Sequence, residues 1–354
     1  MNINDEKILK YSREKDLIVF TKYFGYNFTG ATITTHELVN EWKHYFRSIT
    51  VITRNIGKYQ IEGINIIKAR NIRESIQYAK ELNTVDKIFY TDDHTASILS
   101  LFKIPYYHTY HASWPKAKYV DFKYFIKSFG FIPLYKRSIK HAKSVITVSY
   151  YSRNFTQTIN KNTVVIRNGI GLDRIKNIKK FKDDDKKSIF KIIMIGNIDK
   201  NKYIKALYLF NEIKRNNLDV EIDVYGKIIN SKLAEKISKY EFVKLKGFRK
   251  DINLNEYDLF ISTSKFENLS ISVCEAINLK LPVIAFDIGG LNEVIINDEN
   301  GFLIEKYNTL KMYKFISLIK ENPNIFTYSI DSLDKFKWNL SAKLYVKEFI
   351  YRRV

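Results

Sequence analysis

The sequence predicts an α/β protein made of two doubly wound domains that face a cleft, and three observations support this fold class. Short runs rich in Ile, Val, Phe and Tyr recur along the whole chain, as buried strands do. Amphipathic stretches such as 35–46 and 73–82 separate these runs and predict helices. With 354 residues, the chain is also long enough for two domains of ordinary size. Strands that alternate with helices indicate mainly parallel sheets, which helices cover on both faces.

The expected strands fall into two groups along the chain. Those of the first half are 16–20, 48–53, 64–69, 87–91, 105–110, 144–149 and 163–166. Those of the second half are 190–196, 221–226, 243–247, 258–262 and 282–286. A charged, weakly apolar stretch separates the groups, so we expect an N-terminal domain over 1–172, a linker over 173–188 and a C-terminal domain over 189–335. The three consecutive aspartates at 183–185 fit a solvated charge run better than a metal site.

The composition is that of a packed globular protein with a large excess of basic residues. Hydrophobic residues make up 45% of the chain, and the formal net charge is +21. Such a charge attracts polyanions, although the Lys-rich and Asn-rich product of an AT-rich genome would show the same excess. The N-terminus has no apolar signal-peptide core, no long apolar window predicts a transmembrane helix, and Cys274 is the only cysteine. We therefore expect a cytoplasmic protein without an intramolecular disulfide.

Several common motifs are missing from the sequence. No GxGxxG follows an expected strand, which argues against a nicotinamide or flavin fingerprint. The patterns GxxxxGKS/T, GxSxG and HExxH are also absent, which argues against a P-loop enzyme, a serine-hydrolase elbow and a zincin. We expect no bound cofactor.

Two glutamates bracket the loop that follows the expected strand 258–262. Glu267 lies in that loop, and Glu275 lies early in an expected helix, 271–279. Ligands bind at the carboxyl ends of strands in open α/β sheets, and the free N–H groups of a helix N-terminus suit a phosphate. A carboxylate one turn into the helix can accept hydrogen bonds from the vicinal hydroxyls of a sugar. The spacing fits a nucleotide sugar, although the helix dipole alone also favours acids at such positions.

The residues around these glutamates resemble the glycosyltransferases of family 4, which have the GT-B fold of two Rossmann-like domains. The resemblance lies in an ordered string of a serine, two glutamates, an alanine, a strand opened by proline and a Gly-Gly turn with a glutamate. In this sequence the string is Ser264, Glu267, Glu275, Ala276, 282–287, Gly289, Gly290 and Glu293. Other segments follow the family's order from Asp16 onward, and 336–354 resembles the helix that crosses back to the N-terminal domain.

The resemblance implies roles for residues of the C-terminal domain. Glu275 would bind the ribose of the nucleotide, and Glu267 would act on the transferred sugar as a catalytic residue. The backbone amides of Asn268, Leu269 and Ser270 would approach the phosphates and the sugar.

Two further positions of this domain would contact the diphosphate of the donor. Lys202 matches a lysine that neutralises it, but Asn197 stands where the family usually has an arginine. One charge-assisted contact is therefore missing, and Lys200 is a candidate replacement.

In the N-terminal domain, the resemblance singles out Gly30 and His111. Gly30 would lie in a glycine-rich loop near the donor phosphates, and His111 would contact the donor sugar as a second catalytic residue. A lone histidine is more often structural, but this one follows an expected buried strand in matching context. His108 and His111 could suggest a metal pair, but no cysteine or carboxylate partner is evident, so we expect no metal.

The resemblance also implies the reaction. Members of the family transfer sugar with retention of anomeric configuration, and we expect a nucleotide-sugar donor, UDP-linked, in a reaction that needs no metal. The expected acceptor is lipid-linked or a bacterial surface glycan such as O-antigen in lipopolysaccharide, capsule or cell-wall polymer. Three alternatives stay open: a non-catalytic partner subunit, a GT-B sugar-nucleotide epimerase and a basic binding module.

Residues 114–143, from Trp114 to Lys143, form the most distinctive segment of the N-terminal half. They hold eight basic residues, eight aromatic residues and one acid, Asp121. Basic and aromatic residues mixed on a partly helical segment suit an anionic membrane surface. The alternative is that the aromatic residues are core and the lysines a solvated face. No recognised nucleic-acid module accompanies the segment, so we expect no nucleic-acid partner.

Overall fold

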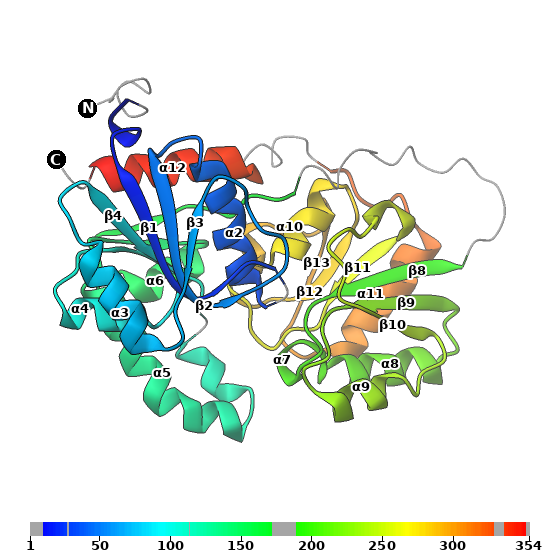
Figure 1. The fold of residues 1–354 in the computed structure, drawn as a ribbon. Helices are drawn as coiled ribbons and strands as arrows, with labels where there is room; N and C mark the ends of the chain where they lie inside the picture. The colour runs from blue at the N-terminus through cyan, green and yellow to red at the C-terminus, as the bar shows by residue number, and fades with distance from the viewer. Residues whose placement is uncertain (1–9, 27, 113, 172–188, 329–335, 352–354) are drawn as a thin grey trace. The chain divides into compact units, whose positions relative to one another are not determined.

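The computed structural model describes residues 10–26, 28–112, 114–171, 189–328 and 336–351, which form two compact units (Figure 1). The first unit joins Met1–Gly169 to Lys335–Val354, and the second covers Ile170–Asp334. Each unit contains one parallel sheet flanked by helices, so the predicted pair of Rossmann-like α/β domains is confirmed. The aspartates at 183–185 lie outside the described residues.

The sheet of the first unit contains every strand expected in the first half of the chain. Its order is β3-β2-β1-β4-β5-β6-β7, and every pairing is parallel. The strands are β1 (Asp16–Phe24), β2 (Ser48–Ile56), β3 (Asn65–Lys68), β4 (Lys87–Thr91), β5 (Tyr107–Tyr110), β6 (Ser144–Thr147) and β7 (Thr163–Val165). Because β2 and β4 flank β1, the strand order reverses at β1, and the carboxyl ends of β1 and β4 meet at one point of the sheet edge.

Helices connect the strands of this unit. They are α2 (Gly30–Trp42), α3 (Ile72–Glu81), α4 (Ala96–Leu101), α5 (Phe122–Lys140) and α6 (Tyr150–Thr156), with a short 3-10 turn at Lys116–Tyr119. Helix α2 begins five residues before the expected start, because Thr29 and Thr32 form a reciprocal capping box there. Among the described residues, no helix is both long and apolar enough to cross a membrane.

The C-terminal helix α12 (Trp338–Tyr351) belongs to the first unit and packs against α2. The rings of Trp42 and Phe349 lie 5.6 Å apart, and both side chains are fully buried. The Tyr107 hydroxyl donates to the Phe349 carbonyl at 2.7 Å, which ties α12 to β5. The last helix of the chain therefore completes the core of the first unit.

The sheet of the second unit has the order β10-β9-β8-β11-β12-β13, again with parallel pairings. Its strands are β8 (Phe190–Ile195), β9 (Val220–Tyr225), β10 (Val243–Gly247), β11 (Leu259–Ser262), β12 (Val283–Phe286) and β13 (Gly301–Ile304). Its helices are α7 (Lys200–Tyr203), α8 (Ala206–Arg215), α9 (Ser231–Ile237), α10 (Ile271–Asn278) and α11 (Thr309–Glu321). The strand order reverses at β8, which lies between β9 and β11.

The expectation that helices cover both faces of the sheets is wrong for one part of the second sheet. Strand β9 buries only alternate residues: Val220, Ile222 and Val224 are buried, whereas Glu221 and Asp223 are partly exposed. Helices α8 and α9 lie together on one side of this sheet (Figure 1). Between β10 and β11 the chain forms only a 3-10 turn, η3 (Leu254–Glu256), so no α-helix is available there to cover the opposite face.

Candidate functional site

The predicted donor residues gather at the switch point of the second sheet, between the carboxyl ends of β8 and β11. Strand β8 leads into Gly196 and Asn197, and β11 leads into the loop 263–270 that carries Glu267. In an open α/β sheet, the crevice at such a point is the usual ligand site.

An ion pair joins the two loops at this point. The Lys202 ammonium, on α7, donates to Oε2 of Glu267. Their side chains are only 23% and 17% exposed, so solvent screens the pair less than a surface pair. Lysine and glutamate are 65 residues apart in the chain, and they meet because β8 and β11 are neighbours in the sheet.

Backbone and side-chain hydrogen bonds fix this geometry from both sides. The side chain of Asn201 accepts from the Phe266 amide at 3.2 Å and donates to the Phe266 carbonyl at 3.3 Å. The Thr263 hydroxyl donates to the Lys202 carbonyl at 2.7 Å, and Asp199 caps α7 by accepting from the Lys202 amide at 2.9 Å. These hydrogen bonds connect helix α7 to the loop that carries Glu267.

The turn formed by Gly289 and Gly290 packs directly against the backbone of the Glu267 loop. Gly289 has φ +63°, and a Cβ on it would lie 1.7 Å from the carbonyl oxygen of Glu267. The Gly290 amide donates to the Asn268 carbonyl at 2.7 Å. Only glycine permits both the left-handed conformation and this close approach.

A second close approach shapes the β8 side of the site. A Cβ on Gly226 would lie 1.9 Å from the Gly196 carbonyl oxygen, and a Cβ on Gly196 would press on the Lys202 stem at 3.2 Å. The two glycines let the chain after β9 lie against the chain after β8, and they let Lys202 cross above Gly196. Asn197 is the residue directly after Gly196, and it is the position where the family resemblance predicts a diphosphate contact.

Helix α10 begins where the Glu267 loop ends. Its N-cap, Ser270, makes no side-chain capping bond, and its hydroxyl instead pairs with that of Ser272 at 3.0 Å. The first-turn amides therefore keep the character of an anion site. Asn268, Leu269 and Glu275 are buried beside this terminus, so Leu269 contributes a backbone amide and not a solvent-facing side chain.

The two N-terminal candidates occupy helix and strand ends in the first unit. Gly30 is the first residue of α2, not part of the preceding loop, and a Cβ there would meet nothing within 4 Å. His111 directly follows β5, and burial next to His108 lowers its pKa to about 3, so the ring is neutral at ordinary pH. His108 is fully buried and its Nδ1 lies 2.8 Å from the Thr91 hydroxyl, a core position.

Sequence reasoning missed a buried carboxylate at the switch point of the first sheet. The two oxygens of Asp92 accept from the hydroxyls of Thr21 and Thr35, each at 2.6 Å. Burial, and then the neighbouring Asp93, raise the pKa of Asp92 to about 7. The available signal was the pair of aspartates directly after the strand that ends at Thr91, where a carboxylate falls on the ligand-binding edge.

No group of three or more histidine, cysteine or carboxylate side chains with metal-binding geometry occurs within the described ranges. Charged groups at the donor-side switch point include Lys202, Glu267 and Glu275.

Comparisons with known proteins match both halves of the chain. A family described as Glycosyltransferase Family 4 matches residues 30–174, and one described as Glycosyl transferases group 1 matches residues 173–330. Together they span most of the sequence, including every site residue predicted from it.

Two curated relatives share part of the chain. A poly(ribitol-phosphate) alpha-N-acetylglucosaminyltransferase of Staphylococcus aureus is 31% identical over 142 residues, 36% of this chain and 29% of the relative. A poly(glycerol-phosphate) alpha-glucosyltransferase of Bacillus subtilis is 29% identical over 144 residues, 37% of this chain and 21% of the relative. The matched segments therefore span less than a third of either relative.

A solved structure covers the chain more fully. The crystal structure of Anabaena Alr3699/HepE in complex with UDP-glucose aligns with a TM-score of 0.74, over 95% of this chain and 99% of that one. At 16% sequence identity, this likeness shows a shared fold. The two family matches and the paired parallel sheets show that the chain belongs to the group 1 glycosyltransferases of the GT-B fold.

Proposed function

We propose that the protein transfers a sugar, with retention of anomeric configuration, from a UDP-sugar to a lipid-linked or surface-glycan acceptor. The observation that carries the proposal is the Lys202–Glu267 pair beside the N-terminus of α10, at the switch point of the second sheet. One cation, one set of free helix amides and two carboxylates lie there within one rigid frame.

Donor binding then exchanges the partners of this ion pair. The diphosphate competes for Lys202 and for the first amides of α10, because both favour negative charge. Glu267 loses its cation and becomes free to accept hydrogen bonds from the hydroxyls of the transferred sugar. Glu275, one turn into α10, is the proposed partner of the ribose.

The chemistry requires stabilisation of the departing diphosphate. Lys202 and the α10 amides are fixed before the reaction, so they stabilise developing charge without reorganisation. In this proposal no metal is required, and Lys200 supports Lys202 in place of the arginine that Asn197 replaces. As the family resemblance implies, we propose a contact to the sugar for His111, whose ring is neutral, and a contact to the phosphates for Gly30.

The acceptor is proposed from the curated relatives. Both are named for polymers of phosphate-linked polyols, and a bacterial surface polymer of this kind, or the glycan of lipopolysaccharide, is the acceptor class we propose. The donor class rests on the site itself and on the UDP-glucose that HepE holds.

A donor screen tests the proposal. Thermal unfolding is followed with UDP-, GDP-, ADP- and dTDP-sugars, with and without EDTA, for the wild type, Glu275→Ala and the matched surface control Glu235→Ala. We expect UDP-sugars alone to raise Tm, with loss of the effect in Glu275→Ala and retention in the control.

Three results would contradict it. Stabilisation by none of the donors favours a partner subunit or a basic binding module. A stabilisation that disappears in EDTA contradicts the metal-free site. Consumption of the donor without an acceptor, with interconversion of its sugar, identifies an epimerase.

We further propose that helix α5 rests on an anionic membrane. The α5 surface consists of Phe122, Phe125, Ile126 and Phe129, which are 77%, 43%, 53% and 68% exposed and follow a helical i, i+3, i+4, i+7 stripe. The buried residues of α5 are Ser128, Ser138 and Ile139, so the large apolar side chains of this stripe are not part of its buried face. The alternative that these aromatic residues form core does not hold for this stripe.

Charge decides which partner fits the α5 surface. Lys123 and Lys127 lie on the same turns and are exposed, and Asp121, at the helix N-cap, is the only acid of the segment. A second copy would present the same positive charge and be repelled. Anionic lipid satisfies both the apolar stripe and the lysines.

Vesicle flotation tests this contact. We expect binding to phosphatidylglycerol vesicles that weakens with salt, none to phosphatidylcholine, and loss of binding in Phe122→Ser/Phe125→Ser/Phe129→Ser. Ile228→Ser/Ile229→Ser removes exposed apolar side chains of the second unit and should leave binding intact. Equal loss in both variants, or no binding of the wild type at low salt, rejects the proposal.

A further inference from the structure

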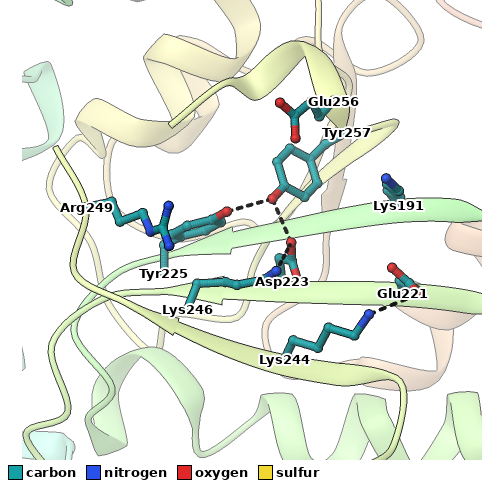
Figure 2. A pocket seen from close by; sticks show the side chains of 9 residues that line it. All are labelled: Lys191, Glu221, Asp223, Tyr225, Lys244, Lys246, Arg249, Glu256 and Tyr257. Carbon is teal, nitrogen blue, oxygen red and sulfur yellow. Dashed lines mark hydrogen bonds and ion pairs between the residues drawn. The ribbon is translucent and has the colours of Figure 1, made fainter. Parts of the chain in front are cut away.

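The open face of the second sheet holds a pocket that the donor site does not use. Figure 2 shows nine side chains around it, and its volume is about 420 Å³. They are Lys191, Glu221, Asp223, Tyr225, Lys244, Lys246, Arg249, Glu256 and Tyr257. We call it the β8–β10 pocket, because these strands form its floor.

The floor is polar because more buried apolar and more exposed charged side chains alternate along strands β9 and β10. In β10, Lys244 and Lys246 point away from the helix-covered side, as Glu221 and Asp223 do in β9. Sheet faces in α/β domains are usually apolar and covered by a helix. Here the chain between β10 and β11 arches over the pocket through Glu256 and Tyr257 and leaves it open (Figure 2).

The acids of the floor already have cations. Lys244 contacts Glu221 at 3.1 Å, and Lys246 contacts Asp223 at 3.3 Å. Asp223 also accepts from the Tyr257 hydroxyl at 2.8 Å. The floor therefore presents little net negative charge to a ligand.

Two tyrosines line the pocket in a hydrogen-bonded chain. The hydroxyls of Tyr225 and Tyr257 lie 3.0 Å apart, and the chain ends on Asp223. Burial, together with its contacts to Tyr225 and Asp223, raises the pKa of Tyr257, so its hydroxyl stays a neutral donor. Tyr225 is only partly buried, and its ring offers a flat surface of the kind that sugars and polyols contact.

Two cations of the pocket are uncommitted. Lys191 and Arg249 are exposed, and neither has an ion-pair partner among the residues that the structure describes. They lie on opposite sides of the pocket in Figure 2. Separate cations on either side of a polar floor suit a chain with repeated anionic groups better than one small anion.

The pocket adjoins the donor site within the second unit. Tyr225, in its wall, directly precedes Gly226, the residue that lies against Gly196 at the end of β8. Tyr225 therefore places one end of the pocket next to the segment that leads from β8 to Asn197.

We propose that the β8–β10 pocket binds an anionic acceptor polymer, a chain of phosphate-linked sugar or polyol units, at a distance from its reacting end. The inference rests on the proposed transferase function, of which it specifies the acceptor. Arg249 holds one phosphate through its planar guanidinium and Lys191 another as a point charge. The hydroxyls of the chain pair with the tyrosines and the floor.

Binding of a fluorescent glycerol-phosphate oligomer measures the site directly. Lys191→Glu/Arg249→Glu is compared with Lys232→Glu/Lys236→Glu, which makes the same charge change at exposed positions of α9. We expect the pocket variant to bind on the order of tenfold more weakly, with a shallower salt dependence, and the α9 variant to bind within about twofold of the wild type. UDP-sugar stabilisation should be unchanged in both.

Each other outcome overturns the inference. Equal weakening in the two variants shows attraction by net charge alone. A thymidine oligonucleotide bound as tightly as the glycerol-phosphate oligomer shows a general polyanion surface. Unchanged oligomer binding in the pocket variant, with UDP-sugar stabilisation present, rejects the pocket and leaves the transferase proposal standing. Absence of UDP-sugar stabilisation in the wild type instead rejects the transferase proposal.

Discussion

At the level of single residues, the proposed donor site contains one pair of opposite charges. Lys202 and Glu267 neutralise each other while no donor is bound. In the proposed function, Lys202 would bind the diphosphate of the nucleotide sugar and Glu267 would bind its transferred sugar. The ion pair offsets the free-energy cost of partly burying these two charges, and in the proposed function the donor takes over this role when it binds.

Substitution of each partner should separate binding from chemistry. We expect Lys202→Ala to weaken UDP-sugar binding about tenfold, because one charge-assisted contact is lost. Glu267→Gln should lower kcat by about a hundredfold or more with a smaller effect on donor binding. Calorimetric titration and initial rates measure the two effects, with Glu235→Gln as the surface control. A Glu267→Gln enzyme with an unchanged kcat would contradict the assignment.

Two glycines of the site make a matched pair. Gly289→Ala should lower the free energy of unfolding by at least about 2 kcal/mol, because φ is +63° and the new Cβ meets the Glu267 carbonyl. Gly30→Ala, with open space in the first turn of a helix, should change it by less than about 1 kcal/mol. Urea unfolding of both variants checks the contrast. Equal effects would mean that the turn tolerates a side chain.

Asp92 gives the first unit a predictable pH dependence. Its pKa is raised to about 7 in the folded protein, so the folded state holds its proton more tightly than the unfolded state. The stabilising contribution is complete below the unfolded pKa of about 3.9 and is lost as pH rises through about 7. From pH 5 to pH 8, Asp92→Asn should gain on the order of 2 kcal/mol relative to wild type. Urea unfolding of both proteins at pH 5 and pH 8 tests this. If the difference between their free energies of unfolding is the same at both pH values, the pKa of Asp92 is not raised.

At the scale of elements, helices lie where local patterns predict them, but their partners are set by contacts far away in sequence. Helix α12 shows this most clearly, since it follows the second unit in sequence and packs in the first. Its residue Phe349 contacts Trp42 of α2 and Tyr107 of β5. Tyr107 lies 242 residues before Phe349 in the chain.

Truncation of one buried α12 side chain should lower the free energy of unfolding of the first unit. Phe349 is fully buried among Trp42, Tyr90 and Tyr107, so Phe349→Ala should cost about 3–5 kcal/mol. Leu344, 39% exposed on the same helix, is the control, and Leu344→Ala should cost less than about 1 kcal/mol. Denaturant unfolding followed by tryptophan fluorescence measures both. Similar losses would show that α12 contributes no core.

At the scale of the whole molecule, the net charge of +21 acts on stability as well as on binding. Like charges repel one another in a compact chain, and salt screens that repulsion. The ion pairs of the structure are mostly exposed and contribute little to oppose it.

Salt should therefore stabilise the protein. We expect Tm to rise by a few degrees between low salt and about 0.3 M sodium chloride, because the Debye length falls below typical distances between surface charges. Lys232→Glu/Lys236→Glu lowers the net charge and should show a smaller rise. Scanning calorimetry in buffers that differ only in sodium chloride measures this change in Tm. A Tm that falls with salt would show that the ion pairs stabilise the protein more than charge repulsion destabilises it.

The amino-acid pattern is enough to predict the two parallel sheets, the order of their strands along the chain and the loop that carries Glu267. These depend on periodicity and on residues close together in the chain, so they can be recognised without the structure. The family resemblance added Lys202, Asn197, Gly30 and His111, whose functional roles stay predictions.

The contacts between groups that are distant in sequence could be known from the folded chain alone. The Lys202–Glu267 pair, the hydrogen bonds of Asp92 and the close approach of Gly289 to Glu267 all depend on which strands are neighbours. The folded chain also decided which faces stay open, on α5 and over β8–β10, because an alternating strand or an amphipathic helix shows two faces in sequence without showing which one the rest of the chain covers.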